Sequence, residues 1–263
     1  MEESQWDQSS SDGEAVAPSL LQFNKEKHVT FLLTMYNLMP HAYQSQEING
    51  LTLAYFVISG LDILQSIYLV DKDAIAKWIL SFQILPARGI EFPNEQFYGF
   101  CGSRSSQYPT DSKIPSLNHS HLASTYCALA MLKTIGYDLS LINKEPILSS
   151  LRNLQQNDGS FVPTHLGAET DLRFTFCAGL QEEHILLNPY RCFSAMTCHS
   201  ISAAICFLLE DWSGMDQEKA KEYILRCQSY DGGFGMTPGA ESHEGRWWDV
   251  LRGCIPSLDG IHT

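Results

Sequence analysis

The sequence lacks any run of basic residues. Its 17 lysines and arginines face 30 aspartates and glutamates, which gives a formal net charge of −13 at pH 7. Proteins that bind nucleic acid usually carry a basic patch or stripe, so this composition argues against a nucleic-acid partner. An acidic face could attract basic proteins, but a well-solvated surface is the simpler interpretation.

Three further features are missing. The eight cysteines form no CxxC pair, which is the spacing typical of zinc sites and redox motifs. The first residues, MEESQWDQSSSDGEAVAPS, are acidic and lack the apolar core of a secretory signal. The most apolar window, 51–70, contains Asp62 and Gln65 at helical spacing, which favours a buried helix over a membrane span. We therefore expect free thiols, a cytoplasmic location and no transmembrane segment.

Strand signals are weak, whereas helical periodicity dominates from Phe23 onward. Residues 1–22 are polar and acidic, and we expect them to form a disordered tail. The expected helices cover residues 24–38, 47–66, 71–83, 121–136, 145–155, 203–211 and 216–228. This pattern predicts an all-α fold.

An internal repeat organises these helices. The segment QQNDGSF (155–161) matches QSYDGGF (228–234) at a distance of 73 residues. Similarly, HLASTYCA (121–128) matches DLRFTFCA (171–178) at a distance of 50 residues. Each unit is therefore interpreted as a helix, a Gln-x-x-Asp-Gly-x-Phe turn, a loop and a second helix.

The turn has a physical logic, which also fits a weaker copy with Gln83 followed by FYGF (97–100). The Asp-Gly pair supplies a tight turn with positive φ. The Phe side chain is expected to pack onto the core. The Gln side chain can hydrogen-bond backbone groups that lack partners at a helix end.

The larger repeat distance indicates an insertion at residues 179–202. This segment has no apolar stripe continuous with its flanks, and it interrupts what would otherwise be one apolar helix. Two interpretations stay open: a surface loop, and a retained intron or misjoined gene model. Loops rarely fall inside a buried helix, which favours the second.

Several stretches carry a recognisable family pattern. They are HAYQSQEINGLTLAYFVISGLDIL (41–64), KWILSFQ (77–83), FYGFCGSRSSQ (97–107), SHLASTYCALAMLKTIGYDLS (120–140), NLQQNDGSF (153–161), ETDLRF (169–174) and CQSYDGGFGMTPGAESH (227–243). The chain thereby resembles the β subunits of protein prenyltransferases, most closely those of the plant type I geranylgeranyltransferases. GSRSSQ and SHLASTYCA favour the type I enzymes over the farnesyl- and Rab-prenylating relatives. The resemblance covers 23–178 and 203–243.

This resemblance implies an α-α toroid, here incomplete, in which outer and inner helices alternate around an aromatic funnel that holds the isoprenoid. It also implies a separate α subunit that wraps around the barrel to form a heterodimer. The implied reaction transfers geranylgeranyl from its diphosphate to the cysteine of a C-terminal CaaX tail, often with Leu at X. In the family, Zn2+ held by Asp, Cys and His activates the substrate thiol as a thiolate. Basic groups stabilise the departing diphosphate.

The resemblance assigns three substrate-binding residues and no catalytic one. Arg173 matches a family arginine that contacts the lipid or the peptide tail, although a structural salt bridge explains it equally well. Phe176 matches an aromatic that packs against the polyprene, and core packing is its alternative role. His243 matches the family's diphosphate-binding histidine, and a helix starting after it would add an attractive dipole for an anion.

The sequence departs from the family pattern after His243. Glu244 and Gly245 stand where the family has two glycines, so an acid lies beside the expected diphosphate site. The family's zinc ligands belong to further repeats that this sequence does not contain, and no metal ligand is assigned. The trio Cys192, Cys198 and His199 matches no common metal spacing.

Two other histidines, His119 and His121, are expected to contact solvent or to cap a helix. The toroid domain is expected to span 23–245, followed by an aberrant tail, 246–263. The Trp-Trp-Asp of this tail must be encoded TGG TGG GAY. A shift by one nucleotide forces the Gly-Gly that the family has at this point, so we interpret the tail as a frameshifted or mis-spliced repeat.

The sequence thus predicts a β subunit of type I protein geranylgeranyltransferase that is inactive alone, because the zinc ligands are missing. The alternative is a non-catalytic form that binds the α subunit. A terpene-cyclase-like toroid would need an Asp-x-Asp-Asp motif, which is absent. A glycosidase would need paired catalytic carboxylates, and none stand out.

Overall fold

The chain folds into helices in the computed structural model, which describes residues 23–38, 46, 49–85, 98–103, 120–165, 170 and 201–242. The α-helices in these ranges are α1 (Lys25–Asn37), α2 (Gly50–Ile63), α3 (Lys72–Leu80), α4 (Leu122–Thr134), α5 (Glu145–Leu154), α9 (Ile201–Leu208) and α10 (Gln217–Arg226). The shorter elements are the 3-10 helices η2 (Ile67–Leu69), η4 (Leu139–Leu141) and η5 (Trp212–Gly214) and the strands β1 (Gln83–Ile84) and β2 (Gly99–Phe100). Every helix predicted from the sequence is confirmed.

Predicted helix boundaries differ from the observed ones by up to three residues, and the predicted helix 71–83 ends at Leu80. Residues 201 and 202 belong to helix α9, whereas the sequence pattern placed them in the insertion. The reason is that Ser202 is fully buried and continues the buried face of Ala203 and Ile205 toward the N-terminus. Residues 1–22, 171–200 and 243–263 lie outside the described residues, so the acidic tail, the rest of the insertion and the aberrant C-terminus stay predictions.

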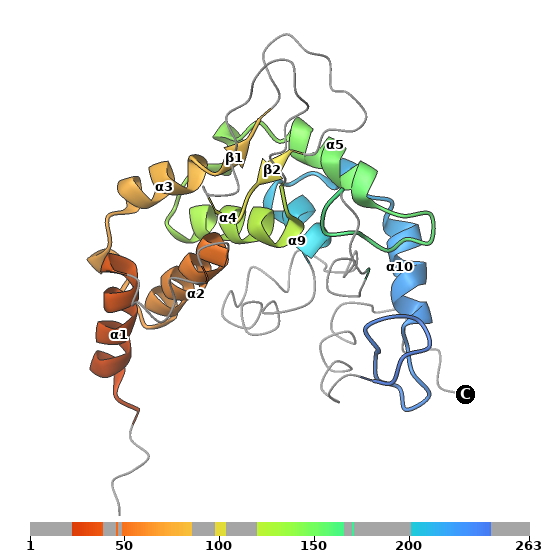
Figure 1. Cartoon of the computed structure of the whole chain (residues 1–263), viewed down its shortest axis with the longest axis horizontal. Coiled ribbons are helices and arrows are strands. Elements are labelled where there is room, and N and C mark those ends of the chain that lie inside the picture. Colours follow the sequence, from red (N-terminus) through yellow and green to blue (C-terminus); the bar gives the residue numbers. More distant parts are fainter. Residues whose placement is uncertain are drawn as a thin grey trace, which may run out of the picture.

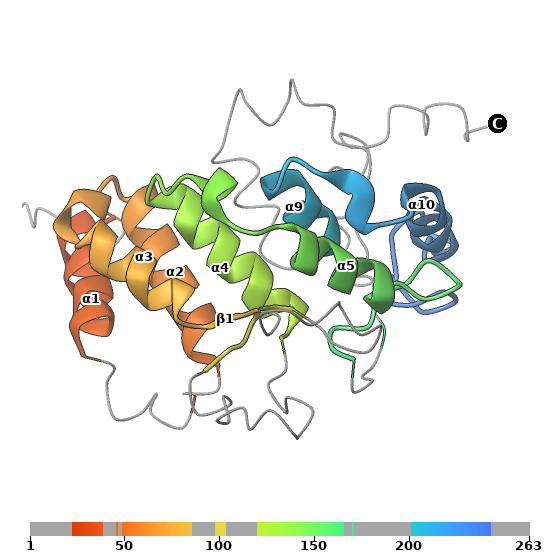
Figure 2. The ribbon, with the colours of Figure 1, turned by 90° about the horizontal axis from the view of Figure 1, so that it is seen from above.

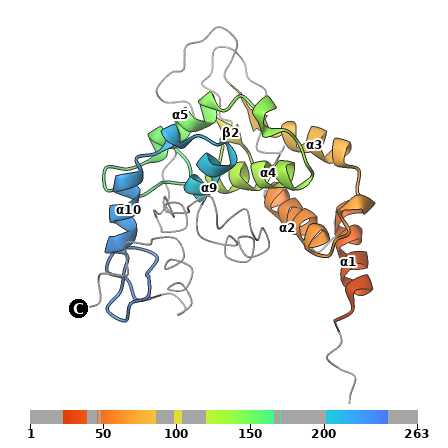
Figure 3. The same ribbon diagram turned by 180° about the vertical axis from the view of Figure 1, so that it is seen from behind.

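The helices form an arc of two layers (Figure 1). Helices α3, α5 and α10 follow the convex side, α2, α4 and α9 lie inside them, and α1 lies beside α2 at one end. The view from above shows α4 between α2 and α9 (Figure 2), and the view from behind shows the same order (Figure 3). Outer and inner helices therefore alternate, as the resemblance implied.

The core lies between these layers. Central helix α4 is buried on nearly all sides, since Leu122 and every residue from Ser124 to Leu132 are buried. Outer helix α5 instead buries one face, which includes Leu148 and Leu151, and exposes Arg152. A helix that is apolar all round must lie between neighbours, whereas an amphipathic helix covers a core from one side. The apolar pattern therefore sets the layer in which each helix lies.

The repeated turn predicted from the sequence is observed at 155–161 and 228–234, and its Gln–Phe pairing occurs three times among the described residues. Its Gln and Phe pair in antiparallel fashion as Gln83↔Phe100, Gln155↔Phe161 and Gln228↔Phe234. All three Phe side chains are at most 2% exposed, so the predicted packing of this residue onto the core is confirmed. The glycines that follow Asp have φ values of +90° at Gly159 and +80° at Gly232, as the Asp-Gly pattern predicted.

The Gln of the middle turn binds backbone, as predicted, but on the next outer helix rather than its own. Gln155 Nε2 donates to the carbonyl of Asp216 at 2.9 Å, and the amide of Asp216 donates to Gln155 Oε1 at 2.7 Å. Asp216 is the N-cap of α10, and its own carboxylate accepts from Lys219 N at 3.1 Å. This reciprocal pair therefore fixes the start of α10 on the turn that follows α5.

The sequence predicted that His121 either contacts solvent or caps a helix. The structure confirms the helix cap. His121 is the N-cap of α4, and its Nδ1 accepts the amide hydrogen of Ala123 at 3.0 Å. Burial lowers the pKa of this imidazole. His119 lies outside the described residues.

The cysteines of the described ranges, Cys101, Cys127, Cys206 and Cys227, are free and buried. Burial raises the pKa of Cys127 and of Cys206 to about 12, and that of Cys227 to about 11. These thiols are consequently protonated and weakly nucleophilic near neutral pH. In the same part of the chain, no helix is long and apolar enough to cross a membrane.

Replacing Gln155 by Ala should lower the free energy of unfolding by about 1–2 kcal/mol, because two hydrogen bonds between repeats are lost. The matched control is Gln228→Ala, at the same position of the next turn, where the side chain has no partner among the described residues. Urea denaturation of both variants measures the difference. Equal losses would contradict the role of the Gln155–Asp216 pair.

Stability should fall between pH 7.5 and 5.5 through His121. Its pKa is lowered in the folded chain, so the unfolded chain takes up a proton first, near the ordinary value of about 6.5. The contribution of neutral His121 to the free energy of unfolding is therefore complete above that pH, and it is lost as the pH falls below it. His121→Asn keeps a capping side chain without titrating, and its melting temperature should fall less than that of the wild type. Identical pH profiles would refute this.

Candidate functional site

The three predicted substrate-binding residues, Arg173, Phe176 and His243, lie outside the described residues. The structure does describe the segment that leads to His243, which ends at Ser242. It also describes the inner helices on which an isoprenoid funnel would be built. The described parts of the expected site are therefore this segment and these inner helices.

The turn before His243 is closed by one carboxylate. Asp231 accepts a hydrogen bond from the amide of Gly233 at 3.0 Å through Oδ1, and one from the hydroxyl of Ser242 through Oδ2. The hydrogen bond from Ser242, followed by that from Gly233, lowers the pKa of Asp231. An ionised Asp231 thus ties the residue next to His243 back to the turn at the end of α10.

Helix α2 carries an exposed apolar face. Phe56 is 51% exposed and Ile63 is 50% exposed, and their separation of seven residues places them on the same side of the helix. The opposite side, which includes Ile58 and Leu61, is buried. A large aromatic side chain left half in water on an inner helix is a candidate contact for an apolar ligand.

Next to this exposed face of α2, Tyr55 forms an aromatic pair with Tyr126 of α4. The rings of Tyr55 and Tyr126 meet edge to face with centroids 5.7 Å apart, and their hydroxyl oxygens are 3.2 Å apart. Tyr55 also lies against Phe56, with ring centroids 5.6 Å apart. Because both tyrosines are buried, the pair holds α2 against α4 and fixes the base from which Phe56 projects.

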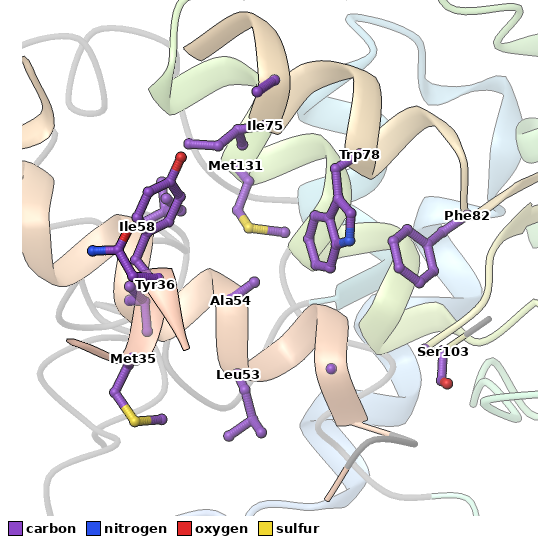
Figure 4. Close-up of a pocket in the computed structure, with 15 residues that line it drawn as sticks. Met35, Tyr36, Leu53, Ala54, Ile58, Ile75, Trp78, Phe82, Ser103 and Met131 are labelled. Carbon is purple, nitrogen blue, oxygen red and sulfur yellow. The ribbon is translucent and has the colours of Figure 1, made fainter. Parts of the chain in front are cut away.

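A separate apolar pocket of about 610 Å³ opens between α1, α2 and α3 (Figure 4). Trp78 and Phe82 form one wall, Tyr36 and Met35 the opposite one, and Met131 of α4 contributes to the floor. It lies at the α1 end of the arc, whereas the turn that leads to His243 lies at the α10 end (Figure 1). The pocket is therefore distinct from the turn that leads to His243.

No three His, Cys, Asp or Glu side chains of the described ranges lie close enough together to hold a metal ion. Cys192, Cys198 and His199 fall outside those ranges. The residues that the structure describes therefore do not fit the zinc ion of the family, and no chemical step through zinc is derived.

Sequence analysis missed the exposed face of α2 and the apolar pocket. One signal was available for the first: α2 is rich in apolar residues on nearly all sides, more than its packing against α1 and α4 buries. The pocket had no sequence signal, because its lining comes from helices that are distant in the sequence.

Comparison with known proteins supports the fold and the family. A model of the prenyltransferase alpha-alpha toroid domain matches residues 23–251. The chain is 54% identical over 225 residues to the geranylgeranyl transferase type-1 subunit beta of Arabidopsis thaliana, which is 85% of this chain and 53% of that relative. It is 34% identical over 239 residues to the same subunit of Dictyostelium discoideum, which is 84% of this chain and 60% of that relative.

Among solved structures, Candida albicans protein geranylgeranyltransferase-I complexed with GGPP matches with a TM-score of 0.62 and 22% identity. The match covers 84% of this chain and 56% of that one, and at this identity it supports the fold alone. The chain spans about half the length of the curated relatives it matches. Both the family model and the identity to the plant relative lead to one conclusion: the chain belongs to the prenyltransferase α-α toroid family.

Proposed function

We propose that the chain is a β subunit of type I protein geranylgeranyltransferase, which acts in the cytoplasm as a heterodimer with a prenyltransferase α subunit. Its substrates are geranylgeranyl diphosphate and proteins with a C-terminal CaaX tail, often with Leu at X. The observation that carries the proposal is the 54% identity to the type-1 β subunit of Arabidopsis. The 26% identity to the farnesyltransferase β subunit of the same plant supports the type I assignment.

The isoprenoid chain, in this proposal, lies along the exposed face of α2. Phe56 offers about half of its ring surface to an apolar ligand, and the Tyr55–Tyr126 pair keeps that ring in place. Arg173 is proposed to contact the lipid or the peptide tail, and Phe176 is proposed to pack against the polyprene. Burial of apolar surface is the main favourable term for a polyprene, which has no hydrogen-bonding group along its length.

The diphosphate is proposed to bind at His243. Support comes from the motif that His243 matches and from the turn that precedes it, in which Asp231 accepts a hydrogen bond from Ser242. A cationic or hydrogen-bonding imidazole would stabilise the negative charge of the diphosphate. Glu244 lies next in the sequence, so its neutralisation would strengthen anion binding.

A second candidate function is a non-catalytic subunit that binds the α subunit without transferring lipid. It rests on the departure from the family pattern after His243, where an acidic residue, Glu244, stands beside the expected diphosphate site. The two candidates are distinguished by co-expressing the full chain with an α subunit and measuring zinc-dependent geranylgeranyl transfer to a CaaX peptide ending in Leu. Transfer supports the first, and a stable complex without transfer supports the second. Failure to bind the α subunit refutes both.

Phe56→Ala should weaken binding of geranylgeranyl diphosphate by about tenfold, since an aromatic contact of this size contributes about 1.4 kcal/mol or more. The control is Tyr68→Ala, which removes another exposed aromatic that lies beyond α2. Titration of a fluorescent diphosphate analogue into the complex with the α subunit measures both affinities. An unchanged affinity in Phe56→Ala would exclude this face as the lipid site.

His243→Ala should weaken binding of geranylgeranyl diphosphate by about tenfold and leave binding of geranylgeraniol unchanged, because only the first ligand carries the diphosphate charge. Competition between each ligand and the fluorescent analogue measures the two effects. A parallel loss of affinity for the alcohol would show that His243 supports the fold or the lipid site instead.

A further inference from the structure

The apolar pocket between α1, α2 and α3 lies on the opposite side of α2 from the face proposed for the isoprenoid (Figure 4). Ala54 and Ile58 line the pocket. Each is two residues away from Phe56 in the sequence, which turns it by about 160° from Phe56 around the helix axis. The volume of about 610 Å³ falls within the range of about 300–1,000 Å³ that is usual for sites of small organic ligands. The pocket is therefore a second hollow, which the proposed lipid site does not use.

Aromatic and other uncharged side chains surround this pocket. The rings of Trp78 and Phe82 meet edge to face on one wall, with centroids 4.7 Å apart, and Tyr36 forms the opposite wall (Figure 4). None of the lining residues in the described ranges carries a charge. Aromatic rings on two walls favour a planar apolar ligand. A charged ligand is disfavoured, because it would lose water there without gaining an ion pair.

Two hydrogen-bond donors on these walls have no partner in the described part of the chain. They are the indole N–H of Trp78 and the hydroxyl of Tyr36. Trp78 is 37% exposed and Tyr36 is half-buried, so both groups are accessible from the pocket or its mouth. A ligand that covers them without an acceptor leaves two donors unpaired, which costs affinity. The walls therefore favour a ligand that carries a hydrogen-bond acceptor.

Helix α1 would gain most from such a ligand. None of its residues is buried. Its half-buried Leu32 lies against Gly60 of α2, and the partly buried side chains of Met35 and Tyr36 line the pocket. A molecule between Tyr36 and Trp78 would join α1 to α3. Because this contact exists only in the folded chain, ligand binding raises the melting temperature.

We propose that this pocket binds a small, planar, uncharged aromatic molecule that carries a carbonyl oxygen. The rings of Trp78, Phe82 and Tyr36 contact the carbon frame of the ligand. The carbonyl oxygen accepts a hydrogen bond from the indole of Trp78 and one from the hydroxyl of Tyr36. The proposal goes beyond the proposed enzymatic function and does not depend on it.

The test measures the affinity of the full chain for three probes by equilibrium dialysis. The first probe, 9-fluorenone, is a planar aromatic ketone. Fluorene has the same carbon frame without the oxygen, and 9-fluorenone-4-carboxylate adds a negative charge. Tyr36→Phe and Trp78→Phe, made singly and together, remove the donors and keep an aromatic ring at each position. Phe56→Ala is the control on the opposite side of α2.

The wild type and Phe56→Ala should bind 9-fluorenone at least tenfold more tightly than fluorene and than the carboxylate. The preference for the ketone over the hydrocarbon should fall at least fivefold in the double variant and by a smaller factor in each single variant. Equal affinities of the wild type for ketone and hydrocarbon overturn the proposal, and so does an unchanged preference in the variants. A tenfold loss of ketone binding in Phe56→Ala would place the probe on the other face of α2, which also overturns it.

Melting temperatures complete the test. Saturating 9-fluorenone should raise the melting temperature of the wild type and of Phe56→Ala, and raise that of the double variant less. Melting curves without ligand show which variants fold, and one folded single variant is enough to measure the change in preference. An equal rise in the wild type and in the folded variants would show that the two donors do not contact the ligand, and would refute the proposed site.

Discussion

The outer helices α5 and α10 are kept in register by the contact between the turn that follows α5 and the start of α10. Apolar packing between layers is strong but non-directional, so by itself it would let α5 and α10 slide past each other. Gln155 accepts the amide hydrogen of Asp216, which a helix start leaves without a helical partner, and it also donates to the carbonyl of Asp216. Gly159 permits the close approach that these hydrogen bonds require. Distance and angle between two outer helices are thereby fixed by polar groups.

Charged contacts reinforce this register at the same place. Arg152 donates to the carbonyl of Ser213 at 2.9 Å and to Glu145 at 2.9 Å, and Lys144 pairs with Asp211 at 3.0 Å. Exposed ion pairs add little stability individually. The contacts Arg152–Ser213 and Lys144–Asp211 are nevertheless directional, and they connect the α5 region to the η5 segment that precedes α10. Helices α5 and α10, which these contacts join through η5, both follow the convex side of the arc (Figure 1).

Much of this architecture could be predicted from the sequence. Helix positions followed from the apolar period, and the conformation of the turn followed from Asp-Gly and from the buried Phe161 and Phe234. Other features depended on partners that no local pattern identifies. Residue type left two roles open for His121, and the folded structure shows that it caps α4 and is largely removed from water. The partner of Gln155 is 61 residues away, so its identity required the packed structure.

The sequence by itself determined the helices, the repeat and the family, because periodicity and turn chemistry are local properties and long motifs are specific. Only the tertiary structure decided which surfaces remain open. Phe56 and Ile58 are both apolar residues of α2, yet the first is half in water and the second is buried. Gly159 and Gly232 share one conformation, yet only the first has a helix against it among the described residues. Exposure is a property of neighbours brought together by folding, and residue type alone does not set it.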